Sequence, residues 1–132
     1  MTPIRAEAIF CDDIRWEANG KQILIGVYPN DLVPAQIPIQ IPISLWIRIH
    51  GLDDTRKHFV AEVRDGGQEP LIAVNVEIDK VPDSEAVVIA LPQLPLEIRS
   101  PQPIVVSLLF EGLPPIEAGR LKITPKWETG KH

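Results

Sequence analysis

The sequence predicts an all-β protein: an antiparallel, immunoglobulin-like β-sandwich of about seven to nine strands, with a small β-barrel as the alternative. Apolar and polar residues alternate along most of the chain, which is typical of half-buried strands, and helical periodicity is nearly absent. With 45% hydrophobic residues, the 132-residue chain has enough apolar material for one buried core. Its 14 prolines fall between apolar runs, as expected of many short strands joined by turns.

The start of the chain predicts a hairpin. Residues 4–18 alternate and place Ile14 and Trp16 on the apolar face. Asn19-Gly20 is a strong hairpin signal and predicts that the chain returns through residues 21–28. One face of this return strand is apolar and consists of Ile23, Ile25 and Val27.

Proline spacing divides the next part of the chain. Residues 28–44 contain four prolines, and each removes a backbone donor. This segment is therefore predicted to be a loop or an extended edge segment, not a central strand. Residues 43–51 alternate cleanly and predict a strand, with Ile43, Leu45, Ile47 and Ile49 on one face.

The remaining elements follow from the same two signals, alternation and turn residues. In chain order they are a loop at residues 52–57, a hairpin at 58–78 around Asp65-Gly66-Gly67, a strand at 85–91, a short proline-broken edge segment at 92–98, a central strand at 103–112, and a last strand at 118–127 with Leu121, Ile123 and Trp127 facing inward. We expect one domain, residues 1–128, and a frayed tail at 129–132.

Composition and charge argue against several classes of function. The net charge of −5 and the lack of a Lys/Arg cluster argue against nucleic acid as a partner. No apolar run reaches the roughly 18–20 residues of a membrane span, and the charged N-terminal segment does not resemble a signal peptide. One cysteine cannot form an internal disulfide, so we expect a cytoplasmic protein.

No catalytic constellation stands out. Cys11 is the only cysteine, and a nucleophilic role would need a base such as His50 or His58. The neighbouring Asp12 and Asp13 would raise the pKa of the thiol, so we predict a structural cysteine and no enzymatic activity. A cysteine-dependent enzyme is the least favoured hypothesis.

Asp12 raises a question of burial. An unbroken strand would place its carboxylate on the inward face with Phe10, where an unpaired charge is costly. A β-bulge at Asp12 or Asp13, a cap on nearby backbone N–H groups, or a buried arginine would each resolve this. Arg15 and Arg48 are the candidate arginines, and Asp12, Asp13 and Arg15 form a predicted structural polar motif.

An interaction surface is predicted on the other face of residues 43–51. Alternation places Trp46, Arg48 and His50 there, and both Trp and Arg are enriched at interface hot spots. Tyr28 would extend this surface. The alternatives are that the proline-rich segment covers the face, or that the strand is buried on both sides.

The opening segment, "AEAIFCDDIRWEANGKQILIGVYPNDL", resembles a small family of bacterial proteins with a domain of unknown function. The shared pattern is F-C-D-D-I/V-R, a Gly-Lys turn and L-I-G-V-Y, present here at Phe10 to Arg15, Gly20-Lys21 and Leu24 to Tyr28. The late "EAGRLKI" is also similar. The resemblance implies a compact β-domain and supplies no catalytic residue.

The leading hypothesis is a non-enzymatic protein-interaction or structural module of a bacterial cytoplasmic protein, with a protein partner or as a homo-oligomer. No cofactor is predicted. The alternative is a small-ligand or calcium-binding module, for which Asp12, Asp13, Asp53 and Asp54 are weak candidate ligands. The carboxylates lack EF-hand spacing, and the histidines lack the spacing of a zinc site.

Overall fold

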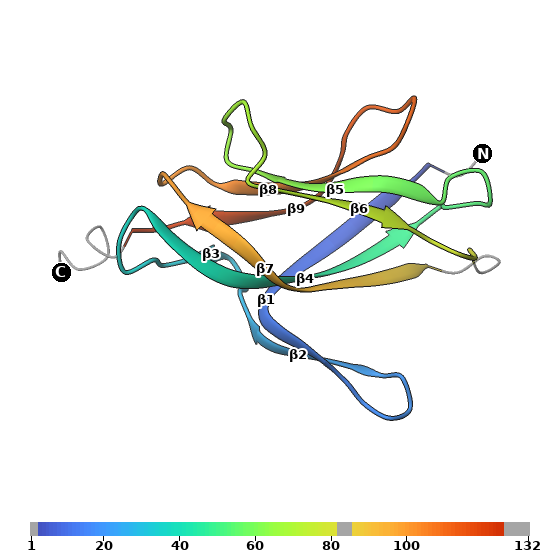
Figure 1. The fold of residues 1–132 in the computed structure, drawn as a ribbon, viewed down its shortest axis with the longest axis horizontal. Coiled ribbons are helices and arrows are strands. Elements are labelled where there is room, and N and C mark those ends of the chain that lie inside the picture. Colours follow the sequence, from blue (N-terminus) through green and yellow to red (C-terminus); the bar gives the residue numbers. More distant parts are fainter. Residues whose placement is uncertain (1–2, 82–85, 126–132) are drawn as a thin grey trace.

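The computed structural model describes residues 3–81 and 86–125, and this part of the chain forms nine strands in two packed sheets (Figure 1). One sheet has the strand order β2-β1-β4-β7 and the other the order β3-β9-β8-β5-β6. The strands are β1 (Arg5–Trp16), β2 (Gln22–Val27), β3 (Asp31–Leu32), β4 (Ile39–His50), β5 (His58–Arg64), β6 (Ile72–Glu77), β7 (Val87–Ile98), β8 (Ile104–Leu109) and β9 (Ile116–Ile123). The predicted sandwich is confirmed, and the sheets do not close into a barrel.

The strand order is that of an immunoglobulin-like sandwich. β1, β4 and β7 occupy the positions of strands A, B and E, and β5, β8 and β9 those of C, F and G. β6 extends the second sheet beside β5, as the added strand of variable-type domains does. β2 has no counterpart in this scheme. Among the described residues, no helix is long and apolar enough to cross a membrane.

The core forms between the sheets from the alternating apolar residues. The predicted core side chains of β4 are at most 1% exposed: Ile43, Leu45, Ile47 and Ile49. From the second sheet, the ring of Phe59 lies 5.0 Å from that of Phe110. Leu121 and Ile123 also point inward as predicted. Full burial of such side chains contributes roughly 1.5–3 kcal/mol each, so this core holds the two sheets together.

One turn and one strand position agree with the predictions from the sequence. Asp65-Gly66-Gly67 lies in the turn between β5 and β6, and β8 is a central strand between β5 and β9. The described residues form one sandwich. Trp127 and the predicted tail at 129–132 lie outside the described residues.

Two predictions about proline-containing segments were right about their place at an edge but wrong about their boundaries. Residues 39–42 are not a separate segment but the start of β4, where Pro42 faces Pro95 of β7. Neither proline has an N–H, so this pair shares no ladder hydrogen bond, and β1 pairs only with residues 44–50 of β4. The prolines therefore lie where β4 has no second neighbour. Residues 92–98 continue β7, which is nevertheless an edge strand as predicted.

Candidate functional site

β1 changes its partner halfway along its length. Residues from Arg5 to Cys11 pair with β4, whereas those from Asp13 to Trp16 pair with β2 alone; Cys11 pairs with both strands. The second half of β1 and the whole of β2 therefore form a two-stranded hairpin that projects from the sandwich (Figure 1). Because an isolated hairpin is marginally stable in water, its root has to be anchored.

The tip of the hairpin is the turn that Asn19-Gly20 predicted. Gly20 N donates to Glu17 O at 3.0 Å, and Glu17 N donates to Lys21 O at 2.8 Å. Gly20 has a φ of +88°, which glycine adopts without steric cost. Asn19 Oδ1 accepts a further hydrogen bond from Lys21 N at 3.1 Å. The turn is a three-residue loop that ends in a glycine bulge.

Ser44 and Gln93 anchor the root. The buried Ser44 Oγ accepts a hydrogen bond from Gln93 N at 3.0 Å and donates one to Asp12 O at 3.3 Å. Gln93 lies in a bulge of β7 opposite Ser44 and has a φ of +55°. Its Nε2 donates to Asp12 O at 3.1 Å and to Asp13 Oδ1 at 3.0 Å. This junction of three strands, with Tyr28 beside it, is here called the β1 corner: Asp12, Asp13, Tyr28, Ser44 and Gln93.

Asp12 is exposed at this corner. Its side chain lies over Gly26, which has a φ of +68° and where a Cβ would overlap the carboxylate. Tyr28 Oη donates to Asp12 Oδ1 at 2.7 Å. Burial, followed by this carboxylate, raises the pKa of Tyr28 to about 12. The inward position expected of Asp12 in an unbroken strand does not arise, because β1 leaves the sandwich at this residue.

Asp13, and not Asp12, caps a nearby backbone N–H group. Its Oδ1 accepts a hydrogen bond from Ile14 N at 2.9 Å, and its Oδ2 accepts one from Arg15 Nε at 2.6 Å. The hydrogen bond from Gln93, and then that from Arg15, hold the pKa of Asp13 below its ordinary 3.8. Cys11 pairs with Val27 and Asp13 with Ile25 in one register, so the predicted bulge in β1 was wrong. Arg15 is an exposed partner and not a buried one.

Cys11 is fully buried at the root of the hairpin. Its thiol donates to Ser44 O, with the sulfur and oxygen 3.7 Å apart. Burial, and next the charge of Asp12, raises the pKa of the Cys11 thiol. Since the thiolate is the reactive form, this environment is that of a structural cysteine.

The hairpin partly covers the predicted surface around Trp46. Trp46 Nε1 donates to Gln22 Oε1 of β2 at 2.7 Å, so the indole is only partly exposed. Arg48 and His50 lie on the same outer face of β4, and Arg48 is exposed rather than a buried partner of Asp12. Tyr28 was wrongly assigned to this surface, because it packs against the core on the opposite side of the sheet.

The candidate calcium ligands are not brought together. Asp53 lies in the loop between β4 and β5, where its carboxylate accepts a hydrogen bond from Thr55 N at 2.9 Å. Asp12 and Asp13 lie at the β1 corner on another part of the first sheet. Among residues 3–81 and 86–125, no group of three or more His, Cys, Asp or Glu side chains is placed to hold a metal ion.

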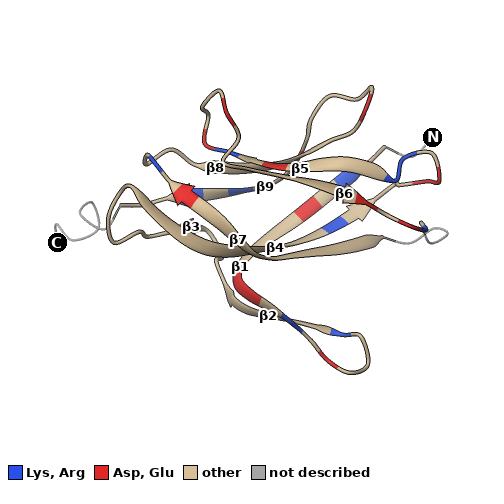
Figure 2. Ribbon diagram, in the orientation of Figure 1, with Lys and Arg blue, Asp and Glu red and all other residues tan. Residues whose placement is uncertain are grey.

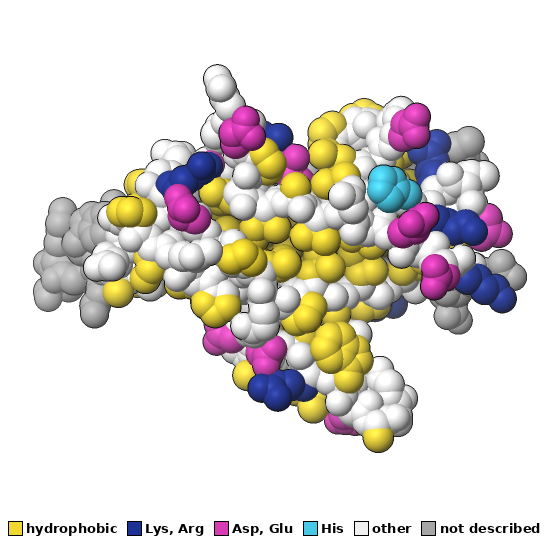
Figure 3. Space-filling view, in the orientation of Figure 1, with side chains coloured by type: hydrophobic (Ala, Val, Ile, Leu, Met, Phe, Trp, Pro, Cys, Tyr) yellow, Lys and Arg dark blue, Asp and Glu magenta, His cyan; other side chains and the backbone are white. Residues whose placement is uncertain are grey.

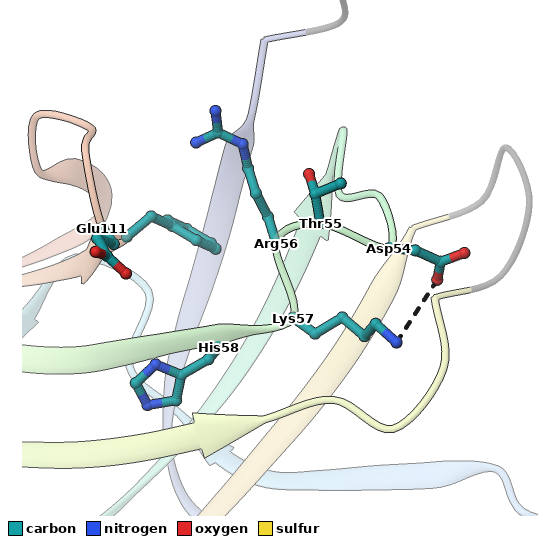
Figure 4. A pocket seen from close by; sticks show the side chains of 7 residues that line it. Asp54, Thr55, Arg56, Lys57, His58 and Glu111 are labelled. Atoms are coloured by element: carbon teal, nitrogen blue, oxygen red, sulfur yellow. Dashed lines mark ion pairs between the residues drawn. The ribbon is translucent and has the colours of Figure 1, made fainter.

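A pocket of about 220 Å³ lies beside this loop and is shown in Figure 4; it is lined by Asp54, Thr55, Arg56, Lys57, His58, Phe110 and Glu111. Lys57 Nζ lies 3.9 Å from Asp54 Oδ1. Arg56, Lys57 and His58 point in different directions (Figure 4). Ligand pockets usually hold polar groups that converge on one point, and these side chains do not.

Most of the exposed apolar side chains lie on the hairpin. Of the six large apolar side chains that are strongly exposed in the described part of the chain, four belong to β1 and β2: Trp16 (53%), Ile23 (44%), Ile25 (44%) and Val27 (48%). The last three lie on β2 and are here called the hairpin face: Ile23 and Ile25 alternate along the strand, and Val27 follows beyond Gly26. Figure 3 shows hydrophobic side chains on the projecting hairpin as well as along the seam between the sheets.

Sequence reasoning found the shared face of Ile23, Ile25 and Val27 but not its exposure. Alternation shows which side chains lie together, and the same pattern occurs in strands that face a core. The turn at Asn19-Gly20 was the available signal for a hairpin. Nothing in the local sequence showed that this hairpin leaves the sandwich.

Comparison with known proteins gives no match: no family model fits the chain, and neither a curated protein nor a solved structure matches it. The resemblance of residues 6–32 to a bacterial family stays a prediction. The function is therefore inferred from the hairpin and its surroundings.

Proposed function

We propose that this chain is a non-enzymatic protein-interaction module whose β1–β2 hairpin is the binding element. The hairpin face carries the proposal: three apolar side chains, each 44–48% exposed, on a strand that projects from the sandwich. Contiguous exposed apolar side chains mark contact surfaces in soluble proteins. Full burial of an exposed aliphatic side chain contributes roughly 1.5–3 kcal/mol, so covering the exposed half of each of these by a partner would contribute about half as much.

The surroundings of the hairpin support a binding role over a catalytic one. At the β1 corner, Asp13, Ser44 and Gln93 use their polar groups in hydrogen bonds that fix the root. Cys11 is a buried thiol with a raised pKa. A single unpaired cysteine fits a reducing compartment, which supports the bacterial cytoplasmic location that we also propose.

The test compares two sets of substitutions. Ile23→Thr, Ile25→Thr and Val27→Thr together keep β-branched side chains but make the hairpin face polar. The matched control is Val33→Thr with Val88→Thr, because these valines are 49% and 38% exposed outside the hairpin. Each immobilised protein is used to capture proteins, including free copies of this chain, from a lysate of the source cells.

We expect the hairpin variant to lose captured proteins about tenfold or more relative to the wild type and the control, because hot-spot side chains dominate binding. Equal capture by all three proteins, or an equal loss by the control variant, would contradict the proposal. So would a wild-type protein that captures nothing.

A further inference from the structure

We propose that the hairpin binds a second copy of this chain, with β2 pairing antiparallel to β2 of that copy about a two-fold axis. The inference rests on the proposed function, because it assigns an occupant to the same hairpin. Addition of a strand to an exposed sheet edge is a common mode of recognition, and two-fold dimers are the commonest homo-oligomers.

β2 is the one edge of the first sheet that carries no protection against pairing. The opposite edge, β7, has Pro92 and Pro95, which remove donors, and a bulge at Gln93. In the second sheet, the edge strand β3 is only two residues long. β6 is also an edge strand, but Val74 and Val76 pack against the core.

β2 has no proline and no charged residue (Figure 2). Natural edge strands usually carry such residues to prevent association, so their absence here points to a strand that pairs. Two identical uncharged strands bring no like charges opposite each other, whereas an acidic or basic partner strand would find no complementary charge. The hairpin also projects from the sandwich, which leaves its outer edge away from the two packed sheets (Figure 1).

The hydrogen bonds of the hairpin identify the backbone groups that face outward. Glu17 N donates to Lys21 O. Since every second residue of an antiparallel strand bonds to the same neighbour, Ile23 and Ile25 are the residues of β2 that bond to β1 near the tip. The backbone N–H and C=O groups of Gln22 and Leu24 therefore point away from β1, toward the open edge. Tyr28 N donates to Phe10 O, although regular alternation from Lys21 would turn the N–H of Tyr28 away from β1. The alternation of inward and outward backbone groups therefore changes near Gly26, and outward groups are assigned only up to Leu24.

One register uses all of these outward groups. If Gln22 pairs with Leu24 of the second copy, and Leu24 with its Gln22, the N–H and C=O groups of both residues in both copies are bonded. Ile23 then lies at the two-fold axis, opposite Ile23 of the second copy. Ile25 lies opposite the aliphatic part of Lys21 of the second copy. The hairpin faces thus form a continuous apolar stripe across the pair.

The test is a charge exchange at Ile23, followed by sedimentation over a range of concentrations. The wild type should dimerise with a Kd on the order of 1–100 μM, because one strand pair is at the low end of specific interfaces. Ile23→Lys and Ile23→Glu should each weaken the homodimer by about 30-fold or more, since like charges would meet at the axis. An equimolar mixture of the two variants should dimerise again, which a misfolded variant could not do. Val88→Lys is the control and should dimerise like the wild type.

Amide hydrogen exchange of the wild type gives a second measurement. Exchange at Gln22 and Leu24 should slow as the concentration rises through the Kd. A wild type that stays monomeric up to about 1 mM would overturn this inference. So would a dimer that persists in Ile23→Lys, or one in which Gln22 and Leu24 stay unprotected. The capture experiment decides the proposed function separately: a monomeric chain whose hairpin still captures other proteins would retain that function and lose only this partner.

Discussion

The two halves of β1 carry the same alternating pattern but have different surroundings. In the first half, Phe10 is buried in the core between the sheets. In the second half, the strand pairs only with β2: Ile14 is still buried, though outside the core cluster, whereas Trp16 and the hairpin face of β2 are exposed to solvent. The difference shows that alternation determines which side chains lie together, whereas the β1 corner determines what they meet. Each prediction below tests this contrast between the sandwich and the hairpin.

The largest expected effect is in the sandwich. Ile47→Ala removes a side chain that is fully buried in the core and should lower the free energy of unfolding by about 2–5 kcal/mol. Ile23→Ala makes the same chemical change on the hairpin face and should alter it by less than about 0.5 kcal/mol in the monomer. Urea unfolding at low protein concentration measures both. Equal losses would mean that the hairpin face is packed against the molecule.

The next effect concerns the anchor of the hairpin. Ser44→Ala leaves the N–H of Gln93 without its acceptor and should lower the free energy of unfolding by about 1–3 kcal/mol. Cys11, buried beside Ser44, should also react faster with a thiol reagent, because the root opens more often. Ser107→Ala, in β8 of the other sheet, is the matched control. An unchanged reaction rate of Cys11 in Ser44→Ala would show that Ser44 does not hold the root closed.

The sequence was sufficient for the parts of the fold that depend on local pattern. The core face of β4, the central position of β8 and the turn at Asn19-Gly20 all follow from alternation or turn chemistry. The β1 corner does not, because Asp12 meets Ser44 and Gln93, which are 32 and 81 positions away in the chain. Its hydrogen bonds exist only once three strands lie side by side. The pairing of Pro42 with Pro95 is likewise a property of the sheet and not of either segment.

A smaller effect is expected in acid. The pKa of Asp13 is held below 3.8 in the folded chain, so its contribution to stability is present above that pH and is lost as the pH falls through the folded pKa. Asp13→Asn should therefore lose less stability than the wild type between neutral pH and pH values below 3.8. Thermal melting across this range measures the difference. Asp79→Asn, which removes one exposed charge elsewhere, is the control, and the same flattening in that variant would contradict a specific role for Asp13.

The most local measurement concerns Tyr28, where the expected effect is a change in the titration of one side chain. It is the only tyrosine of the chain, so the absorbance of tyrosinate reports its ionisation alone. Its pKa of about 12 lies above the ordinary 10, so the stabilisation is complete below the ordinary value and is lost as the pH rises through the folded one. Asp12→Ala removes the acceptor and the negative charge but not the burial, and should bring the pKa of Tyr28 to a value between the two. Asp13→Ala should leave it nearer the wild-type value, because the carboxylate of Asp13 does not accept the hydrogen bond of Tyr28. A titration curve that is identical in Asp12→Ala and the wild type would show that Tyr28 is held by the core alone, and that Asp12 takes no part in fixing the point where the hairpin leaves the sandwich.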